Sequence, residues 1–145
     1  MKTNIQKMII ADYEEAYQLW TETEGMGLRA LDDSESGINR FLKRNPDTNF
    51  ICRVDGRLCG VILCGHDGRR GYIYHTAVHE EFRKQGIGRR LVEAAMTSLE
   101  KEGIKKAALV VFKNNDRGNR FWESIGFKER DDLNYKNRVI DEFNI

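Results

Sequence analysis

The chain has 145 residues, of which 40% are hydrophobic, with 24 Lys and Arg against 23 Asp and Glu. This length suits one domain, residues 1–145, and this apolar content excludes an intrinsically disordered chain. A net charge of +1 argues against sequence-independent binding of nucleic acid, which needs a large cationic excess. We therefore expect no nucleic-acid partner, and any anion site must be local.

The hydropathy pattern argues against a membrane protein. The longest unbroken apolar run, residues 107–112, is far short of the roughly 20 residues that cross a bilayer. The N-terminus lacks the apolar stretch of a signal peptide, so we expect a cytoplasmic protein. The three cysteines, Cys52, Cys59 and Cys64, lie in apolar segments without a C-x-x-C pair. This predicts buried thiols rather than a disulfide framework or a zinc site.

The N-terminal part is expected to form a strand and two short helices. The strand falls on residues 3–10. Asp12 and Glu15 have the spacing of a capping box, which predicts a helix over residues 12–24. A second amphipathic pattern predicts a helix over residues 34–44.

Three antiparallel strands in series are expected next. Asp55-Gly56 supplies the positive φ that a tight turn needs between strands at residues 49–54 and 58–64. The polar, glycine-bearing segment 66–71 indicates a second turn, and a strand at residues 72–78 follows it.

In the C-terminal half, helical periodicity returns. A helix of about 15 residues ends at Gly103, and a second helix covers residues 116–124. Segment 106–112 between them, apolar from Ala107 onward, reads as a covered strand, and residues 127–140 carry a weaker strand-turn-strand pattern. The expected fold class is therefore α+β (α/β), built around a mixed sheet.

The most informative segment, residues 76–91, runs from a strand through a basic loop into a long helix. The first turn of a helix has unpaired N–H groups that favour anions, and glycines let a phosphate approach the backbone. Neither the Rossmann fingerprint nor the P-loop fits, because the third glycine and the Gly-Lys-Ser/Thr triplet are missing. The loop thus predicts a site for a pyrophosphate or phosphorylated cofactor. Its cations are Arg83, Lys84, Arg89 and Arg90.

The loop pattern Arg83-x-x-Gly86-x-Gly88 resembles the R/Q-x-x-G-x-G/A motif of the GNAT superfamily of acetyl-CoA-dependent N-acetyltransferases. The likeness covers nearly the whole chain in element order. Within the family, the chain resembles the small bacterial single-domain members. It implies the GNAT (acyl-CoA N-acyltransferase) fold, with a mostly antiparallel sheet of about six to seven strands and about four helices. It also implies acetyl-CoA as cosubstrate and no metal. Further matching landmarks are Ala77-Val78, residues 115–118 and residues 121–127.

The resemblance assigns roles by position. The strands at residues 72–78 and 106–112 are expected to splay apart, and the pantetheine arm would pair with backbone at Thr76 and Val78 in the gap. Backbone N–H groups of residues 84–89 would hold the pyrophosphate, and one near Val78 would polarise the acetyl carbonyl. The expected cofactor-binding residues are Thr76, Ala77, Val78, Arg83, Lys84, Gln85, Gly86, Ile87, Gly88, Arg89, Asn115, Gly118 and Trp122.

The chain departs from the family at the expected acid and base. Many relatives carry a tyrosine where this chain has Trp122, and an indole N–H cannot act as an acid near neutral pH. The two positions at which relatives carry a glutamate base are Tyr72 and Val110 here. The usual acid and base are therefore both absent.

Tyr74 and Tyr72 are the side chains nearest the expected acyl centre and are weak candidates for catalysis. Aromatic residues on a central strand also serve as core packing. Strand alternation places both tyrosines on one face and His75 on the other. An imidazole can act as a base, but on that opposite face we expect His75 to be structural. His75 and His79 lack further ligands at a consistent spacing, so we expect no metal.

We therefore expect an N-acetyltransferase in which a primary amine attacks the thioester of acetyl-CoA directly. No cysteine lies on the loop or the strand end, which argues against an acyl-enzyme. The amine, from a small molecule or a peptide or protein N-terminus, would enter near the first two helices and the loop at Asp67. Two alternatives stay open: a module that binds acyl-CoA without turnover, and transfer of a longer acyl group. A homodimer is also compatible with the sequence.

Overall fold

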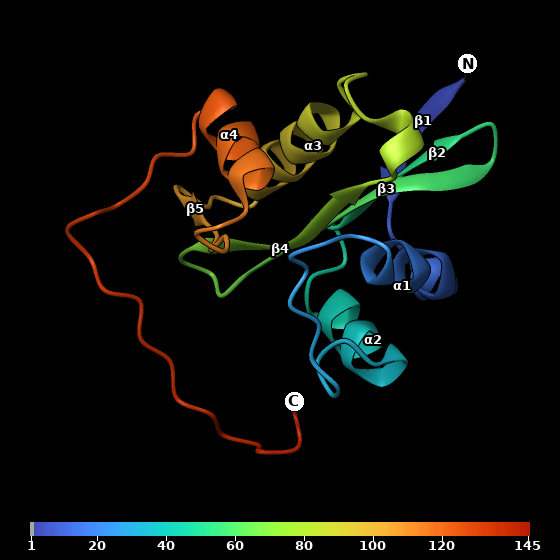
Figure 1. Ribbon diagram of the computed structural model, residues 1–145. Coiled ribbons are helices and arrows are strands. Elements are labelled where there is room, and N and C mark those ends of the chain that lie inside the picture. Colours follow the sequence, from blue (N-terminus) through green and yellow to red (C-terminus); the bar gives the residue numbers. More distant parts are fainter. Residues whose placement is uncertain (1) are drawn as a thin grey trace.

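The computed structural model describes residues 2–145, which form a five-stranded sheet with helices on both faces (Figure 1). Neighbouring strands are antiparallel except for the parallel pair β4 and β5. This confirms the mixed, mostly antiparallel sheet, but five strands replace the six to seven that we expected. In order across the sheet they are β1 (Thr3–Lys7), β2 (Phe50–Val54), β3 (Arg57–His66), β4 (Gly71–Val78) and β5 (Ala107–Ala108).

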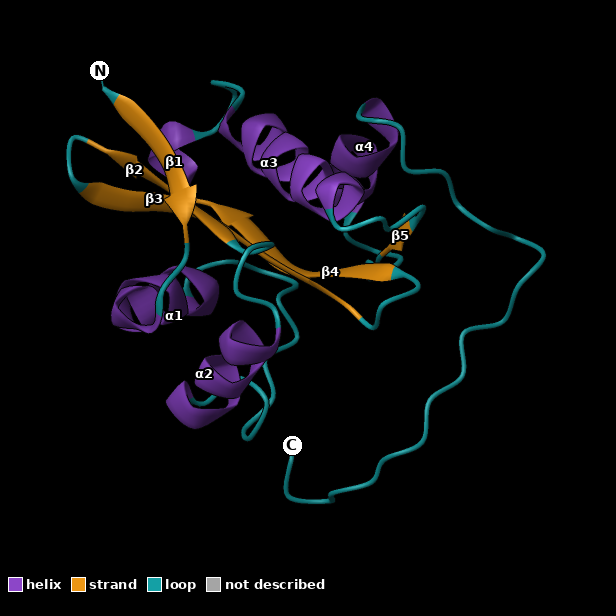
Figure 2. Ribbon diagram, turned by 180° about the vertical axis from the view of Figure 1, so that it is seen from behind, coloured by secondary structure: helices purple, strands orange, loops and turns teal. Residues whose placement is uncertain are grey.

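Four α-helices flank this sheet within the described residues, as expected. Two of them, α1 (Tyr13–Thr21) and α2 (Glu35–Arg44), cover one face. The other two, α3 (Ile87–Lys101) and α4 (Asp116–Ser124), cover the opposite face (Figure 2). Short 3-10 turns, η1 (Ile10–Asp12) and η2 (Glu80–Phe82), follow β1 and β4. Across residues 2–145, no helix combines the length and apolar character that a membrane span requires.

Each face of the sheet has its own apolar core. Leu91 of α3 belongs to one core and Trp20 of α1 to the other, and both are fully buried. The three cysteines are buried free thiols, as predicted. Burial raises the pKa of Cys59 and of Cys64 to about 12, so neither thiol is a nucleophile at neutral pH.

The expected capping box at Asp12 and Glu15 is wrong. The Asp12 carboxylate makes no cap hydrogen bond to α1; its Oδ2 accepts from the Ile9 N–H at 2.9 Å instead. Arg53 of β2 donates to Asp12 Oδ1 and to Glu15 Oε1, both at 2.9 Å. The two carboxylates therefore join the start of α1 to the sheet, a contact that local spacing does not reveal.

The C-terminal half differs most from the sequence expectation. The strand expected over residues 106–112 is reduced to Ala107–Ala108, and residues 127–140 contain no strand. After α4 the chain swings away from β5 and ends beside the segment that precedes α2 (Figure 1). Because no strand then pairs with the outer edge of β5, residues 109–112 stay irregular and leave Val110 and Phe112 more than half exposed.

Candidate functional site

The sheet opens between β4 and β5. Their pairing is limited to Gly71 with Ala107 and Tyr72 with Ala108. Beyond Tyr72, residues 73–78 pair with β3 on one side and with no described strand on the other. The expected splay is therefore present, and a free strand edge can take an extended ligand as an added strand.

A β-bulge lies on β4 beside this opening. One residue of β3, Ile62, lies opposite two residues of β4, His75 and Thr76. His75 has a φ of +32°, which is costly for a residue with a side chain. The extra residue reverses the alternation along β4, so that Ile73 lies in the α3-side core and Ala77 in the α1-side core.

Because of the bulge, His75 lies with the tyrosines on the face covered by α1 and α2. The rings of Tyr72 and Tyr74 are 4.7 Å apart, and the His75 ring is 6.4 Å from that of Tyr74. Tyr74 also contacts Phe41 of α2 at 5.7 Å, and His75 contacts Trp20 of α1 at 5.2 Å. The prediction that His75 faces away from the two tyrosines is therefore wrong.

Burial changes the acidity of both tyrosines. It raises the pKa of Tyr72 to about 12, with Tyr135 adding to the effect. It also raises the pKa of Tyr74, with the Asp32 carboxylate adding to the effect. A phenol with a raised pKa stays protonated at neutral pH, so these side chains can donate a proton but cannot act as bases.

The loop between η2 and α3 presents backbone N–H groups to solvent. Gly86 is the residue before α3 and has a φ of +81°, and Lys84 has a φ of +63°. Within the described chain, the N–H groups of residues 85–89 have no acceptor. A Cβ at Gly86 would meet no atom within 4 Å, so this side of the loop is open. The geometry suits an anion, as the sequence indicated.

The other residues of the motif either pack against neighbouring elements or surround this loop. A Cβ at Gly88 would lie 3.1 Å from the Phe121 ring of α4, so glycine lets α3 and α4 approach closely. Ile87 is buried in the core beneath the loop. The exposed side chains around the loop are Lys84, Gln85, Arg89 and Arg90.

Two arginines add charge at the end of β4. Arg83 donates from Nε to the Val78 carbonyl at 2.9 Å and so ties the loop to the strand end. Partial burial lowers the pKa of Arg83, and the charge of Arg117 lowers it further. Arg117 was not among the predicted residues, although its place two positions after the landmark Asn115 is a signal that could have found it.

The landmarks on α4 have structural contacts of their own. Asn115 is the N-cap of the helix, and its Oδ1 accepts from the Gly118 N–H at 2.9 Å. A Cβ at Gly118 would lie 2.5 Å from Asn115 Nδ2, so this cap requires a glycine. Trp122 packs against the rings of Phe121 and Phe127 at 5.0 and 5.1 Å. A role for these residues toward a cofactor stays a prediction.

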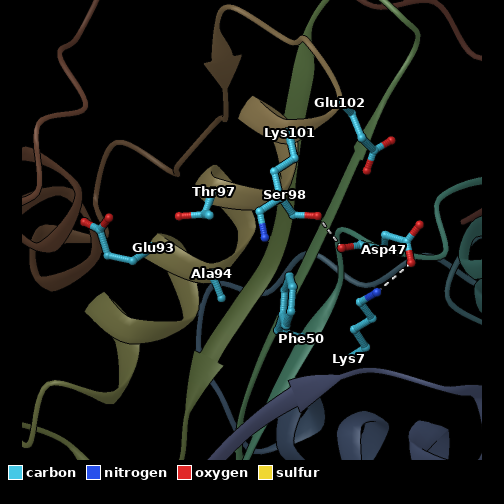
Figure 3. A pocket seen from close by; sticks show the side chains of 9 residues that line it. All are labelled: Lys7, Asp47, Phe50, Glu93, Ala94, Thr97, Ser98, Lys101 and Glu102. Atoms are coloured by element: carbon cyan, nitrogen blue, oxygen red, sulfur yellow. Dashed lines mark hydrogen bonds and ion pairs between the residues drawn. The ribbon is translucent and has the colours of Figure 1, made fainter.

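Two surface hollows lie away from this site. The larger, about 610 Å³, lies beside α3 where Lys7 binds the Asp47 carboxylate at 2.8 Å (Figure 3). The smaller, about 240 Å³, lies along the second half of α3. Neither is lined by residues 72–89. Within residues 2–145, no three His, Cys, Asp or Glu side chains are grouped to hold a metal ion.

Known proteins share both the sequence pattern and the fold. Residues 9–127 match the model of the Acetyltransferase (GNAT) family. The chain belongs to the GNAT family. An acetyltransferase of Pectobacterium atrosepticum is 30% identical to this GNAT chain over 131 residues, which cover 90% of this chain and 92% of the relative.

Solved structures support the GNAT fold. The PaiA N-acetyltransferase from Thermoplasma acidophilum, in complex with coenzyme A, has a TM-score of 0.78 at 21% identity, over 90% of this chain and 92% of that one. The ribosomal-protein-S18-alanine N-acetyltransferase from Escherichia coli has a TM-score of 0.73 at 23% identity, over 89% and 79% of the two chains. The expected family and fold are confirmed, and this GNAT chain is an acyl-coenzyme A-dependent acetyltransferase.

Proposed function

We propose that residues 1–145 of this GNAT chain act as one catalytic domain that transfers the acetyl group of acetyl-CoA to a primary amine. The observation that carries the proposal is one continuous surface. The free edge of β4 at residues 73–78 leads directly into the unpaired N–H groups of residues 85–89. An extended arm that ends in a pyrophosphate matches both parts of this surface.

Acetyl-CoA would bind along this surface. The pantetheine arm would pair with the backbone of residues 76–78, and the pyrophosphate would accept from the N–H groups at the start of α3. The exposed cations Lys84, Arg89 and Arg117 would neutralise the phosphates. Asn115 and Gly118, which shape the start of α4, would lie beside the arm.

The amine would approach from the face covered by α1 and α2. On that face Tyr74 is 43% exposed, and the negative charge of Asp32 helps to raise its pKa. A carboxylate beside the entrance favours a cationic amine, either on a small molecule or at a peptide N-terminus. Because the three cysteines are buried, the amine would attack the thioester without an acyl-enzyme.

The cofactor site is tested by comparing Gly86→Asp with Gly103→Asp. The two glycines lie at opposite ends of α3, have φ values of +81° and +82°, and have open space where a Cβ would lie. Both changes therefore carry similar backbone strain. A carboxylate at position 86 would repel the pyrophosphate, so calorimetry should show at least about tenfold weaker acetyl-CoA binding for this variant alone. Equal affinity in the two variants would remove the loop from the proposal.

Turnover is tested by incubating the protein with acetyl-CoA and a panel of amines while free thiol is measured. The panel would contain an alanine-terminated peptide, a lysine-containing peptide and an aminoglycoside. We expect thiol release with an acetylated amine as the second product. Tight binding of acetyl-CoA without thiol release would favour the non-catalytic binding module. Faster thiol release from a longer acyl-CoA would favour transfer of a longer acyl group.

The remaining expectations concern the protein in solution. The homodimer and the cytoplasmic location stay predictions, which sedimentation and cell fractionation would test.

A further inference from the structure

A buried histidine–carboxylate pair lies at the bulge of β4. His75 Nε2 is 2.7 Å from Asp33 Oδ1, and the two side chains are 12% and 6% exposed. Asp33 lies in the segment before α2, 42 positions away in the chain. The Trp20 indole N–H donates to the His75 carbonyl at 3.0 Å, which helps to hold the strained backbone in place.

The hydrogen bonds of Asp33 determine which imidazole nitrogen carries the hydrogen. Asp33 Oδ2 already accepts from the Arg29 N–H at 2.7 Å, and the Tyr13 hydroxyl donates to the Asp33 backbone carbonyl. An ionised carboxylate is an acceptor at both oxygens, so His75 donates from Nε2–H. The neutral ring then has its lone pair on Nδ1.

The Nδ1 atom of His75 can be reached by water. It has no hydrogen-bond partner among residues 2–145. Every buried side-chain nitrogen and oxygen atom of these residues does have a partner. The nitrogen must therefore be accessible to solvent. The titratable groups around the ring are Asp33 and its neighbour Asp32, Tyr74 on its own strand, and Tyr13 and Tyr17 of α1; Trp20 and β3 contribute none there. Burial raises the pKa of Tyr13 and of Tyr74, and both oxygens of Asp33 already accept hydrogen bonds, which leaves the imidazole as the available base.

We propose that His75 is the general base for the acceptor amine and that Asp33 is its positioning residue. This proposal rests on the proposed acetyl transfer. The ammonium nitrogen gives one proton to His75 Nδ1, directly or through one water, and then forms a bond to the thioester carbon. The carbon–sulfur bond breaks, and the second proton from nitrogen ends on the departing thiolate. The imidazolium returns its proton to solvent. The usual glutamate is thus replaced by a pair that the bulge brings to the amine side.

The first test compares the pH profile of His75→Gln with that of the wild type, using the alanine-terminated peptide as acceptor. As the pH increases, wild-type kcat/KM should begin to rise well below the pKa of the free amine, because the enzyme removes the proton from the bound ammonium group. The variant should lose about 10²-fold in kcat/KM at pH 7, and its profile should follow the amine itself. A loss of the same factor at every pH would indicate a structural role and overturn the proposal.

His66→Gln is the matched control. His66 also binds a carboxylate, Glu102, at 2.7 Å, but it lies at the far end of β3, against the end of α3. Its pH profile should match the wild type. Acetyl-CoA affinity, measured by calorimetry, should be unchanged in both histidine variants. An acetyl-CoA affinity that falls together with activity in His75→Gln would overturn the assignment as a base.

The second test reads the tautomer without activity. The chain has three histidines, so nitrogen-15 spectra can assign each ring. The neutral His75 ring should carry its hydrogen on Nε2, and Asp33→Asn should weaken this preference and lower kcat more than it raises KM. Hydrogen on Nδ1 in the wild type would overturn the proposal. If the wild type acetylates the peptide and His75→Gln keeps the wild-type pH profile, the role of the His75–Asp33 pair is overturned but the proposed function is not. If no acetylated amine forms at all, the proposed function is overturned as well.

Discussion

Trp122 occupies the position at which many GNAT relatives carry a proton-donating tyrosine. Its partly buried ring packs edge-on against Phe121 and Phe127, at the border of the core that contains Leu91. An indole in this place contributes apolar contact and cannot protonate a thiolate. The aromatic side chains of the candidate site, Tyr72 and Tyr74, lie on the other face of the sheet with α2.

This placement predicts the effect of Trp122→Tyr. The smaller ring should lose packing and lower the melting temperature by about 3 °C, the equivalent of about 1 kcal/mol for a domain of this size. The new hydroxyl would remain among aromatic rings, so turnover should not rise. Differential scanning fluorimetry and thiol release measure the two effects. An increase in turnover would instead show that a tyrosine at this position reaches the leaving thiolate.

The junction of α1 with β2 depends on charge. Arg53 binds Glu15 with both terminal nitrogens, at 3.1 and 2.9 Å, and also binds the buried Asp12 carboxylate. The Arg53 guanidinium lowers the pKa of Glu15 below its ordinary value of 4.5. A carboxyl whose pKa is depressed by folding stabilises the folded state above its unfolded pKa, and this contribution is lost as the pH falls through the folded value.

Glu15→Gln should therefore reduce the acid sensitivity of folding. The Glu15 side chain is 49% exposed, so the loss at pH 7 should be small, about 0.5 kcal/mol. Between about pH 5 and pH 3 the free energy of unfolding should fall less steeply than in the wild type. Urea unfolding across this range measures both effects.

Glu14→Gln is the control for this change, because Glu14 is exposed and forms no ion pair in the described part of the chain. It should leave the pH dependence unchanged. Identical acid sensitivity in Glu15→Gln and the wild type would exclude the Arg53 pair as a contributor to stability.

The C-terminal segment links α4 to the segment that precedes α2. After α4 the chain runs around the open edge of the sheet and returns to the segment before α2 (Figure 2). Asn144 Oδ1 accepts from the N–H groups of Leu31 and Asp32 at 3.0 and 2.9 Å, and its Nδ2 donates to Asp32 Oδ2 at 2.8 Å. The Ile145 carbonyl accepts from the Ala30 N–H at 2.8 Å. The chain end thus orders the segment that carries Asp33, the partner of His75.

Asn144→Ala should loosen this segment without unfolding the domain. We expect the amide hydrogens of Leu31 and Asp32 to exchange at least about tenfold faster, since both lose their acceptor. Phe143→Ala is the control, because that neighbouring side chain is 71% exposed. Hydrogen exchange followed by NMR measures the effect, and unchanged protection of both amides would contradict the proposed connection.

Local sequence patterns determined much of the fold and the glycine-bearing loop before α3. The Asp55-Gly56 turn, the helix at residues 116–124 and the glycine-bearing loop before α3 all lie where the sequence placed them. Each depends on contacts within a few residues: a positive φ, an N-cap or a helical apolar stripe. Periodicity therefore predicts such features well.

Only the tertiary structure decided the remaining features. The bulge that turns His75 toward α1 depends on pairing with β3, and its partner Asp33 lies 42 positions away. The short β5 has no strand at its outer edge, since residues 127–140 carry a strand pattern but form no strand there. Strand pairing and buried polar contacts join distant segments, and no local pattern encodes which segments meet.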